Sequence, residues 1–140
     1  MAKYKIPSIT TDIFIFDENF NFILIKRKNN PYKNHWALPG GFVEYGECVE
    51  TAAIREAKEE TNIDVELKDL VNVYSNPDRD PRGHTITIAY TAKGDFSTGK
   101  ADSDACDIHI FSPAKLDEIN LAFDHAKIIK DCLNKVKSEK

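Results

Sequence analysis

The chain has 140 residues, of which 41% are hydrophobic and 30% are charged, and its formal net charge is −4. These values fit one folded domain over residues 1–140 and exclude a disordered or fibrous chain. An acidic balance argues against nucleic-acid binding. The opening stretch MAKYKIPSITTDIFIF has no apolar run long enough for a signal peptide or a membrane span. We therefore expect a cytoplasmic protein without a membrane partner.

The chain begins with two β-rich runs, residues 8–16 and 21–28, and the polar stretch DENF between them predicts a hairpin. The segment WALPGGFVE follows at residues 36–44, where Pro-Gly-Gly interrupts regular structure. A helix rich in alanine and glutamate is predicted over about residues 47–61, with Asn62 as the left-handed residue that ends it.

The second half of the chain predicts further strands at residues 65–74 and 85–91, separated by the charged turn NPDRDPRGH. A polar loop at residues 93–104 leads to a short strand at residues 107–111. An apolar stripe with helical spacing predicts a C-terminal helix over about residues 125–136. The order β-β-β-α-β-β-β-α indicates an α/β domain with a mixed sheet and helices packed on it.

The three cysteines, Cys48, Cys106 and Cys132, are irregularly spaced and include no CxxC pair. This pattern does not predict a disulfide framework or a zinc site, and it favours a reducing compartment. We interpret all three as small apolar packing residues.

The predicted first helix gathers Glu56, Glu59 and Glu60 within little more than one turn. Like charges four residues apart destabilise a helix by roughly 0.2–0.5 kcal/mol. At about 100° per residue, Val49, Ala53, Glu56 and Glu60 share one stripe, so the acids continue the apolar line towards the protein body. Carboxylates in a partly desolvated place need cations among them.

Arg55 can reach Glu59 at the (i, i+4) position, but one arginine does not balance three acids. A hard divalent cation such as Mg²⁺, which takes oxygen ligands and joins carboxylates to phosphates, is one solution. The alternative is an ordinary solvated helix, and the spacing alone does not choose between the two.

From Gly41 onward the chain reads G-x5-E-x7-R-E-A-x-E-E-x-N-I. This resembles the signature of the Nudix hydrolases, G-x5-E-x7-R-E-U-x-E-E-x-G-U, in which U is aliphatic. Asn62 replaces the closing glycine, and Ala57 stands where a larger aliphatic residue is usual. Neither departure changes a carboxylate, so we expect the geometry of the motif to be kept.

The resemblance implies an α/β/α sandwich and hydrolysis of a nucleoside diphosphate derivative with Mg²⁺, or with Mn²⁺ in its place. It implies that Glu56, Glu59 and Glu60 bind the metal and carry the catalysis, that the Gly40 carbonyl is a further ligand, and that Gly41, Glu47 and Arg55 support the site. A further catalytic acid from a later loop is common in the family. Asp104 is our candidate for it, although its stretch ADSDACD also reads as a plain polar loop.

Two further segments, RDPRGH at residues 79–84 and LAFDH at residues 121–125, resemble the ADP-ribose pyrophosphatase branch of the family. This implies hydrolysis of ADP-ribose to AMP and ribose 5-phosphate. The residues that we expect to contact the substrate are Arg27, Arg79, Arg82, Phe123 and His125. Structural roles are the alternative, with the two loop arginines paired to Asp78 and Asp80.

The motif is shared by several activities, so other substrates stay open: an oxidised nucleoside triphosphate, a nucleotide sugar or a dinucleoside polyphosphate. A non-catalytic ADP-ribose sensor is a further alternative, but its DNA-binding domain has no room after the predicted C-terminal helix. The resemblance also suggests a homodimer in which both subunits shape the pocket.

Overall fold

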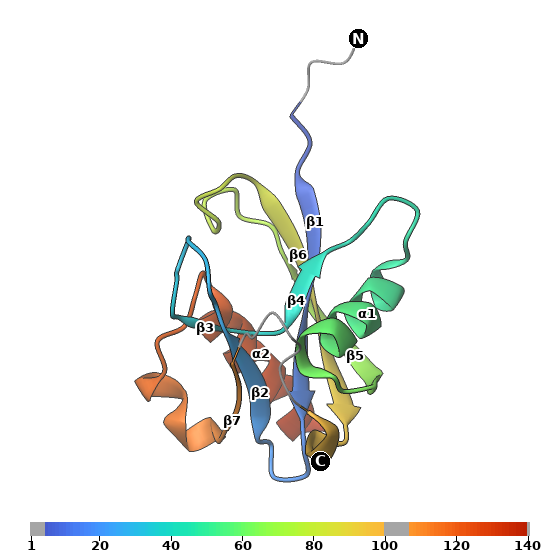
Figure 1. Cartoon of the computed structure of the whole chain (residues 1–140), viewed down its shortest axis with the longest axis vertical. Helices are drawn as coiled ribbons and strands as arrows, with labels where there is room; N and C mark the ends of the chain where they lie inside the picture. The colour runs from blue at the N-terminus through green and yellow to red at the C-terminus, as the bar shows by residue number, and fades with distance from the viewer. Residues whose placement is uncertain (1–4, 100–106, 140) are drawn as a thin grey trace.

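The computed structural model describes residues 5–99 and 107–139, in which one seven-stranded mixed sheet is covered by two α-helices (Figure 1). This confirms the expected α/β class. In chain order the elements are β1 (Ser8–Phe16), β2 (Phe22–Lys26), β3 (Trp36–Ala37), β4 (Gly40–Phe42), α1 (Val49–Thr61), β5 (Val65–Tyr74), β6 (Thr85–Gly94), β7 (Ile108–Phe111) and α2 (His125–Ser138), with short 3-10 helices at Phe96–Thr98 and Pro113–Glu118.

Strand β1 is the centre of the sheet, whose order is β3-β2-β1-β6-β5. It pairs with β6 in parallel along its whole length, and β5 adds to β6 in antiparallel orientation. The predicted hairpin closes only at its turn, because the register between β1 and β2 contains the single pair Phe16–Phe22. The two strands then diverge, and the other end of β1 pairs with β4 instead.

The Pro-Gly-Gly segment was expected to interrupt regular structure, and two short strands lie here, separated by a break at Leu38 and Pro39, with both glycines in β4. Before it, β3 extends the sheet beyond β2, and after it, β4 crosses to β1, where Gly40 lies opposite Asp12. Between the two strands, the Pro39 carbonyl accepts the Ile13 N–H at 2.9 Å. The Leu38–Gly41 segment is therefore fixed to the middle of the sheet.

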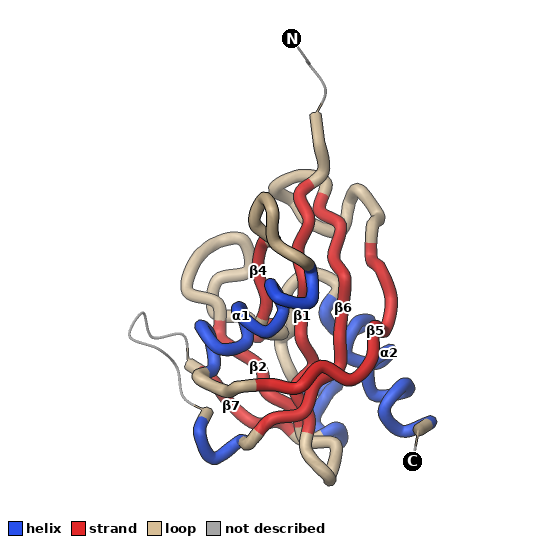
Figure 2. Tube along the Cα trace, turned by 90° about the vertical axis from the view of Figure 1, so that its right-hand side faces the viewer, coloured by secondary structure: helices blue, strands red, loops and turns tan. Residues whose placement is uncertain are grey.

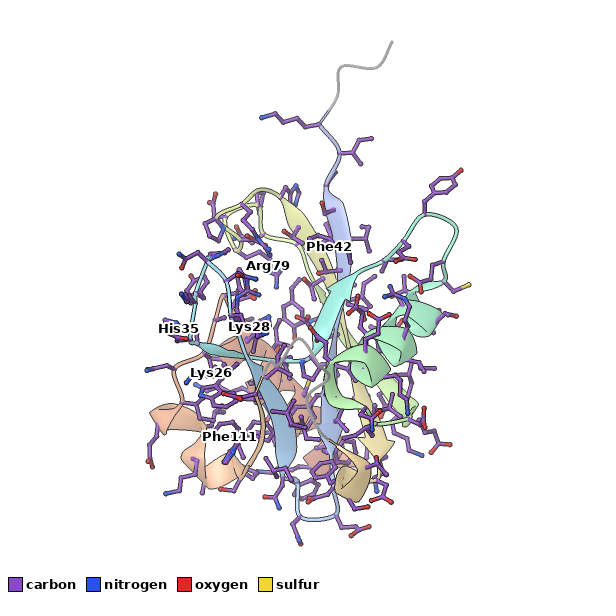
Figure 3. The ribbon with its side chains drawn as sticks, in the orientation of Figure 1. Lys26, Lys28, His35, Phe42, Arg79 and Phe111 are labelled. Atoms are coloured by element: carbon purple, nitrogen blue, oxygen red, sulfur yellow. The ribbon has the colours of Figure 1, made fainter. Side chains whose placement is uncertain are left out.

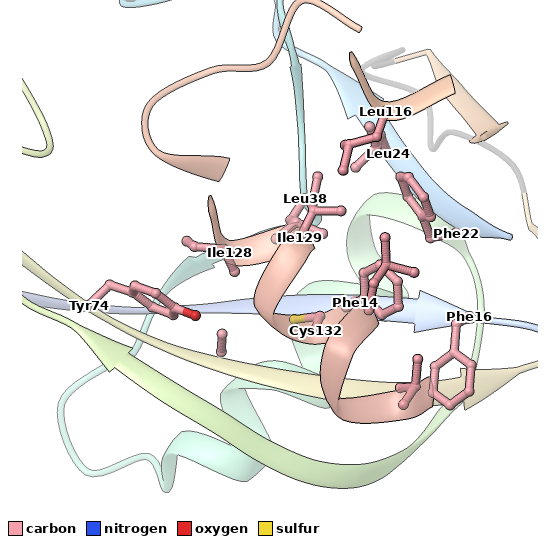
Figure 4. Packing of buried hydrophobic residues seen from close by; sticks show 13 residues of the cluster. Phe14, Phe16, Phe22, Leu24, Leu38, Tyr74, Leu116, Ile128, Ile129 and Cys132 are labelled. Carbon is pink, nitrogen blue, oxygen red and sulfur yellow. The ribbon is translucent and has the colours of Figure 1, made fainter. Parts of the chain in front are cut away.

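Both faces of β1 are buried, because successive side chains of a strand point to opposite faces. Ile13 and Ile15 pack with Ala53 and Ala57 on the α1 side. Phe14 and Phe16 pack in the larger cluster with apolar residues of α2 (Figure 4). The two helices consequently cover opposite faces of the sheet, as the turned view in Figure 2 shows.

Helix α1 ends where the sequence predicts but begins later than predicted. Asn62 has a φ of 63°, in the left-handed region, and its N–H donates to the Lys58 carbonyl at 2.9 Å. The helix begins at Val49, two residues later than expected, because the Glu47 N–H closes a turn onto the Glu44 carbonyl. Within the described residues, neither helix has the length and hydropathy that a membrane span requires.

Candidate functional site

The acidic end of α1 faces the Leu38–Gly41 segment, and Glu60 makes the direct contact. Its Oε1 accepts the Gly40 N–H at 2.8 Å. Burial, together with the nearby charges of Glu56 and Asp12, raises the pKa of Glu60 to about 8. No lysine, arginine or histidine in residues 5–99 and 107–139 forms an ion pair with this carboxylate. Within the described residues, the Glu60 carboxylate is thus buried without a cationic side chain as its direct partner.

Glu56 lies one helical turn earlier and packs against the backbone of Gly41. A Cβ at Gly41 would collide with the Glu56 carboxylate, so this close approach requires glycine. Burial raises the pKa of Glu56, while the Arg55 guanidinium opposes the shift. Glu56 and Glu60 thus bring two carboxylates with raised pKa values to the two glycines.

Arg55 connects α1 to the segment before it through a two-point ion pair with Glu47. Its Nε and Nη2 donate to the two Glu47 carboxylate oxygens at 2.7 Å and 2.9 Å. This pairing lowers the pKa of Glu47 to about 2. Arg55 also donates to Glu56 at 3.1 Å and to the Phe42 carbonyl at 3.2 Å. It is placed to orient Glu56 and to hold β4 against the helix.

Asp12 is a site residue that the sequence analysis did not single out. It lies on β1 opposite Gly40, is 7% exposed, and its Oδ2 is 3.2 Å from Nε2 of His125. Its one sequence signal was a charged residue in the middle of the apolar stretch SITTDIFIF. A buried carboxylate in such a strand is expected to have a partner, but the partner is 113 positions away in sequence and cannot be read from spacing.

One cavity of about 150 Å³ is lined on one side by an acidic floor, Asp12 and Glu60, and on the other by the residues expected to contact the substrate. Figure 3 shows two of its walls, Phe42 on β4 and Arg79 in the loop between β5 and β6, at the same end of the sheet. Of the residues singled out from the sequence, the cavity is lined by Gly40, Gly41, Glu60, Arg27, Arg79, Arg82, Phe123 and His125.

The two loop arginines have different partners. Arg79 donates to both oxygens of Asp124 at 2.8 Å and 2.7 Å and to the Thr87 hydroxyl at 2.6 Å, and its side chain is 6% exposed. Arg82 pairs with Asp80 at 2.8 Å and is 47% exposed. The alternative of a loop paired to itself therefore holds for Arg82 and is wrong for Arg79, which fixes the loop to the start of α2.

The Phe123 ring lies at the cavity, among the guanidinium groups of two arginines and a further aromatic ring. The guanidinium carbons of Arg27 and Arg82 lie 5.0 Å and 5.3 Å from the centre of its ring. The Tyr32 ring is 4.8 Å away, between centres. Phe123 also has a φ of 51°, which is uncommon for a residue with a bulky side chain. A planar, negatively charged ligand would find complementary surfaces here.

The glutamates provide only part of a metal coordination shell. Among the described residues, no three His, Cys, Asp or Glu side chains converge as a complete ligand set. Glu59 is 57% exposed, whereas Glu56 is 14% exposed. The buried oxygens of Glu56 and Glu60 beside Gly40 fit a hard divalent cation that keeps water or phosphate oxygens in its remaining positions, as Mg²⁺ does. Asp104 lies outside the described residues.

Comparison with known proteins places the chain in a family. A model of the NUDIX domain matches residues 7–132. Over 134 residues the chain is 48% identical to a Methanocaldococcus jannaschii protein named ADP-ribose pyrophosphatase, and the match covers 94% of this chain and 78% of the relative. The chain belongs to the NUDIX domain family. Within that family it is a Nudix hydrolase, as the glutamate motif predicted.

Two further matches are to proteins whose names refer to ADP-ribose. The chain is 32% identical over 147 residues to the ADPR responsive transcriptional repressor NtrR of Acinetobacter baylyi, covering 99% of this chain and 58% of the repressor. Among solved structures, the NUDIX domain of Shewanella oneidensis NrtR complexed with ADP ribose matches with a TM-score of 0.83 and 27% identity. That match covers 95% of this chain and 90% of the other.

Proposed function

We propose that this protein hydrolyses the pyrophosphate bond of ADP-ribose and releases AMP and ribose 5-phosphate. One observation carries the proposal: a single cavity is lined by the Glu60 carboxylate of α1, by Arg27, Arg79 and Arg82, and by the Phe123 ring. The 48% identity to a relative named for this activity supports the choice of substrate.

In the proposed site, Mg²⁺ is held by Glu56, Glu59, Glu60 and the Gly40 carbonyl, and Mn²⁺ is the alternative ion. The bound cation would neutralise charge on the phosphoryl oxygens and lower the pKa of a coordinated water. The Arg55 guanidinium would keep Glu56 oriented through its contact at 3.1 Å. Glu60, whose pKa is raised to about 8 in the metal-free site, would release its proton when it binds the cation. We retain Asp104 as a further acid.

The proposed substrate contacts differ in how directly they act. Arg82 is half exposed beside the Phe123 ring, so it can reach a phosphate, and the ring offers a face for the adenine. Arg27 contacts the same ring and donates to the Pro31 carbonyl at 2.8 Å. Arg79 is buried in its pair with Asp124, and we assign to it the task of fixing the loop that carries Arg82.

The activity is tested with purified protein, Mg²⁺ and a panel of substrates whose products are separated by chromatography. ADP-ribose should give AMP and ribose 5-phosphate with a higher kcat/KM than an oxidised dGTP, a nucleotide sugar or a dinucleoside polyphosphate. Glu60→Gln should lose about 10²–10⁴-fold in kcat while its circular dichroism spectrum is kept. Faster turnover of oxidised dGTP than of ADP-ribose would assign the protein to another substrate.

A second candidate function is the binding of ADP-ribose without hydrolysis. The similarity to the Acinetobacter repressor and to the NrtR domain favours it, since both names refer to ADP-ribose. Calorimetric titration of the wild-type protein with ADP-ribose and Mg²⁺ distinguishes the two functions. A sensor gives a stable binding isotherm and no AMP, whereas a hydrolase gives the continuing heat of turnover.

We further propose that the protein is a homodimer located in the cytoplasm. Its ligand is a small nucleotide, and it binds neither nucleic acid nor a membrane. The irregular cysteines support the reducing compartment, and the net charge of −4 supports the absence of a nucleic-acid partner. Exposed apolar side chains support the dimer: Ile6 is 82% exposed, and Phe42 and Tyr45 are at least half exposed.

A further inference from the structure

The imidazole of His125 is buried beside the cavity, and both of its ring nitrogens are engaged within the protein. The Leu38 N–H donates to Nδ1 at 3.0 Å. A nitrogen that accepts carries no hydrogen, so the neutral ring has its hydrogen on Nε2, which lies 3.2 Å from Oδ2 of Asp12. Neither nitrogen is left for a substrate. His125 lines the cavity, so its expected role as a substrate contact stays a prediction.

The three groups that this imidazole connects come from distant parts of the chain. His125 is the first residue of α2, Asp12 lies on β1, and Leu38 precedes the Pro-Gly-Gly segment. Leu38 is 3% exposed, and the next residue, Pro39, has no N–H. The Leu38 N–H is thus the last backbone N–H before Gly40, and His125 holds the Leu38–Gly41 segment through it.

The same segment is tied to the chain before α2 by backbone hydrogen bonds. The Trp36 N–H donates to the Asn120 carbonyl, and the Ala122 N–H donates to the Trp36 carbonyl, each at 2.8 Å. On its other side, Gly40 pairs with Asp12 in the sheet and donates to Glu60 at 2.8 Å. The imidazole therefore links the start of α2 to Leu38, and the chain from Leu38 leads directly to Gly40, which contacts Glu60.

We propose that His125 and Asp12 are positioning residues that set where Gly40 stands relative to Glu60, and thereby tune the affinity of the site for a divalent cation. The proposal rests on the proposed function only in assigning a cation to Glu60 and Gly40. The proposal assigns neither residue a substrate contact, although both line the cavity. Outer partners of this kind orient the ligating groups, and their loss weakens metal binding by about 10–100-fold.

The test measures the dissociation constant of Mn²⁺ on metal-stripped, nucleotide-free protein by electron paramagnetic resonance of the free ion. His125→Ala removes the acceptor for the Leu38 N–H and the Nε2 contact with Asp12. His125→Asn keeps an acceptor close to the position of Nδ1 and loses the donor to Asp12. Phe123→Ala is the matched control, because this side chain lines the same cavity and packs against the His125 ring at 5.6 Å between centres, but carries no polar atom that could bond Leu38 or Asp12.

His125→Ala should raise the dissociation constant of Mn²⁺ by at least about tenfold, and His125→Asn should restore most of the lost affinity. Phe123→Ala should leave that constant unchanged and raise the KM for nucleotide. A wild-type Mn²⁺ affinity in His125→Ala, accompanied by a raised KM, would overturn the proposal and make His125 a substrate contact.

If His125→Ala does not fold, nitrogen NMR of the wild-type protein tests the same arrangement. The imidazole should be neutral with its hydrogen on Nε2, and a hydrogen on Nδ1 would overturn the proposal.

The outcome of the Mn²⁺ titration is independent of the substrate assignment, since no nucleotide is present. Loss of Mn²⁺ affinity in His125→Ala without any ADP-ribose hydrolysis by the wild type would support the positioning role and reject the proposed function.

Discussion

Glu60 is a buried carboxylate close to two others, Glu56 and Asp12, so its ionised form is disfavoured in the folded protein. Its pKa rises from 4.5 to about 8 on folding, mainly through desolvation. Between these values the folded protein holds a proton that the unfolded chain releases. Without divalent ions, the free energy of unfolding should therefore decrease as the pH rises from about 4.5 to about 8, by at most about 1.4 kcal/mol per pH unit.

Urea denaturation at several pH values in EDTA measures this slope, and Glu60→Gln is the comparison because it cannot ionise. The difference between the two proteins should narrow when Mg²⁺ is added, since the cation stabilises the ionised carboxylate. Parallel stability curves for wild type and Glu60→Gln across this pH range would mean that Glu60 is not buried as described.

Gly41 makes a second prediction at the residue scale, because its φ lies outside the left-handed region and only space requires glycine. Gly41→Ala should displace the flexible Glu56 carboxylate and destabilise the fold by about 1 kcal/mol, at the lower end of overpacking costs. In a Glu56→Ala background the same change should have little effect. Urea denaturation of the four proteins gives this coupling, and equal losses in both backgrounds would contradict the contact.

The sequence predicted some site residues well and others poorly, for a physical reason. Glu47, Arg55, Glu56 and Glu60 lie within two segments joined by a short turn, so their spacing restricts their geometry. The partner of Arg79 is Asp124, 45 positions later, and a sheet and a helix have to pack before the two can meet. The internal partners of His125 were missed for the same reason.

At the scale of elements, boundaries were best predicted where burial alternates. Every second residue of β5 is more exposed through most of its length, and its predicted bounds, residues 65–74, are the observed ones. The two short strands around Leu38 and Pro39 were missed, because two- and three-residue strands carry no periodicity of their own. They exist because β1 and β2 diverge and leave an edge of β1 for β4 to pair with.

The end of α1 gives a prediction about helix termination. Asn62 is left-handed, and its side chain donates to the Thr98 carbonyl at 3.2 Å. Asn62→Ala should lower the free energy of unfolding by about 1–2 kcal/mol, because a Cβ without a local hydrogen bond disfavours this conformation. Asn62→Gly should stay within about 0.5 kcal/mol of wild type. Urea denaturation of both variants checks the order, and an alanine variant more stable than the glycine variant would refute it.

At the scale of the whole molecule, the proposed homodimer can be tested by sedimentation. The wild-type protein should have twice the chain mass of 15.9 kDa, and Tyr45→Asp combined with Ile6→Asp should sediment as a monomer. Leu70→Asp is the control, since Leu70 is 52% exposed but lies on β5, away from that surface. A wild-type monomer at every concentration would contradict the dimer.

The charges around the cavity have a consequence for the order in which ligands enter. Among the lining residues that the structure describes, Arg27, Arg79 and Arg82 face Asp12, Asp80 and Glu60, so above about pH 8, where Glu60 is ionised, the positive charges are matched by negative ones. A free pyrophosphate dianion gains no net attraction on entry. The protein should consequently accept nucleotide and magnesium as one neutral complex, and a surplus of uncomplexed nucleotide should compete poorly with it.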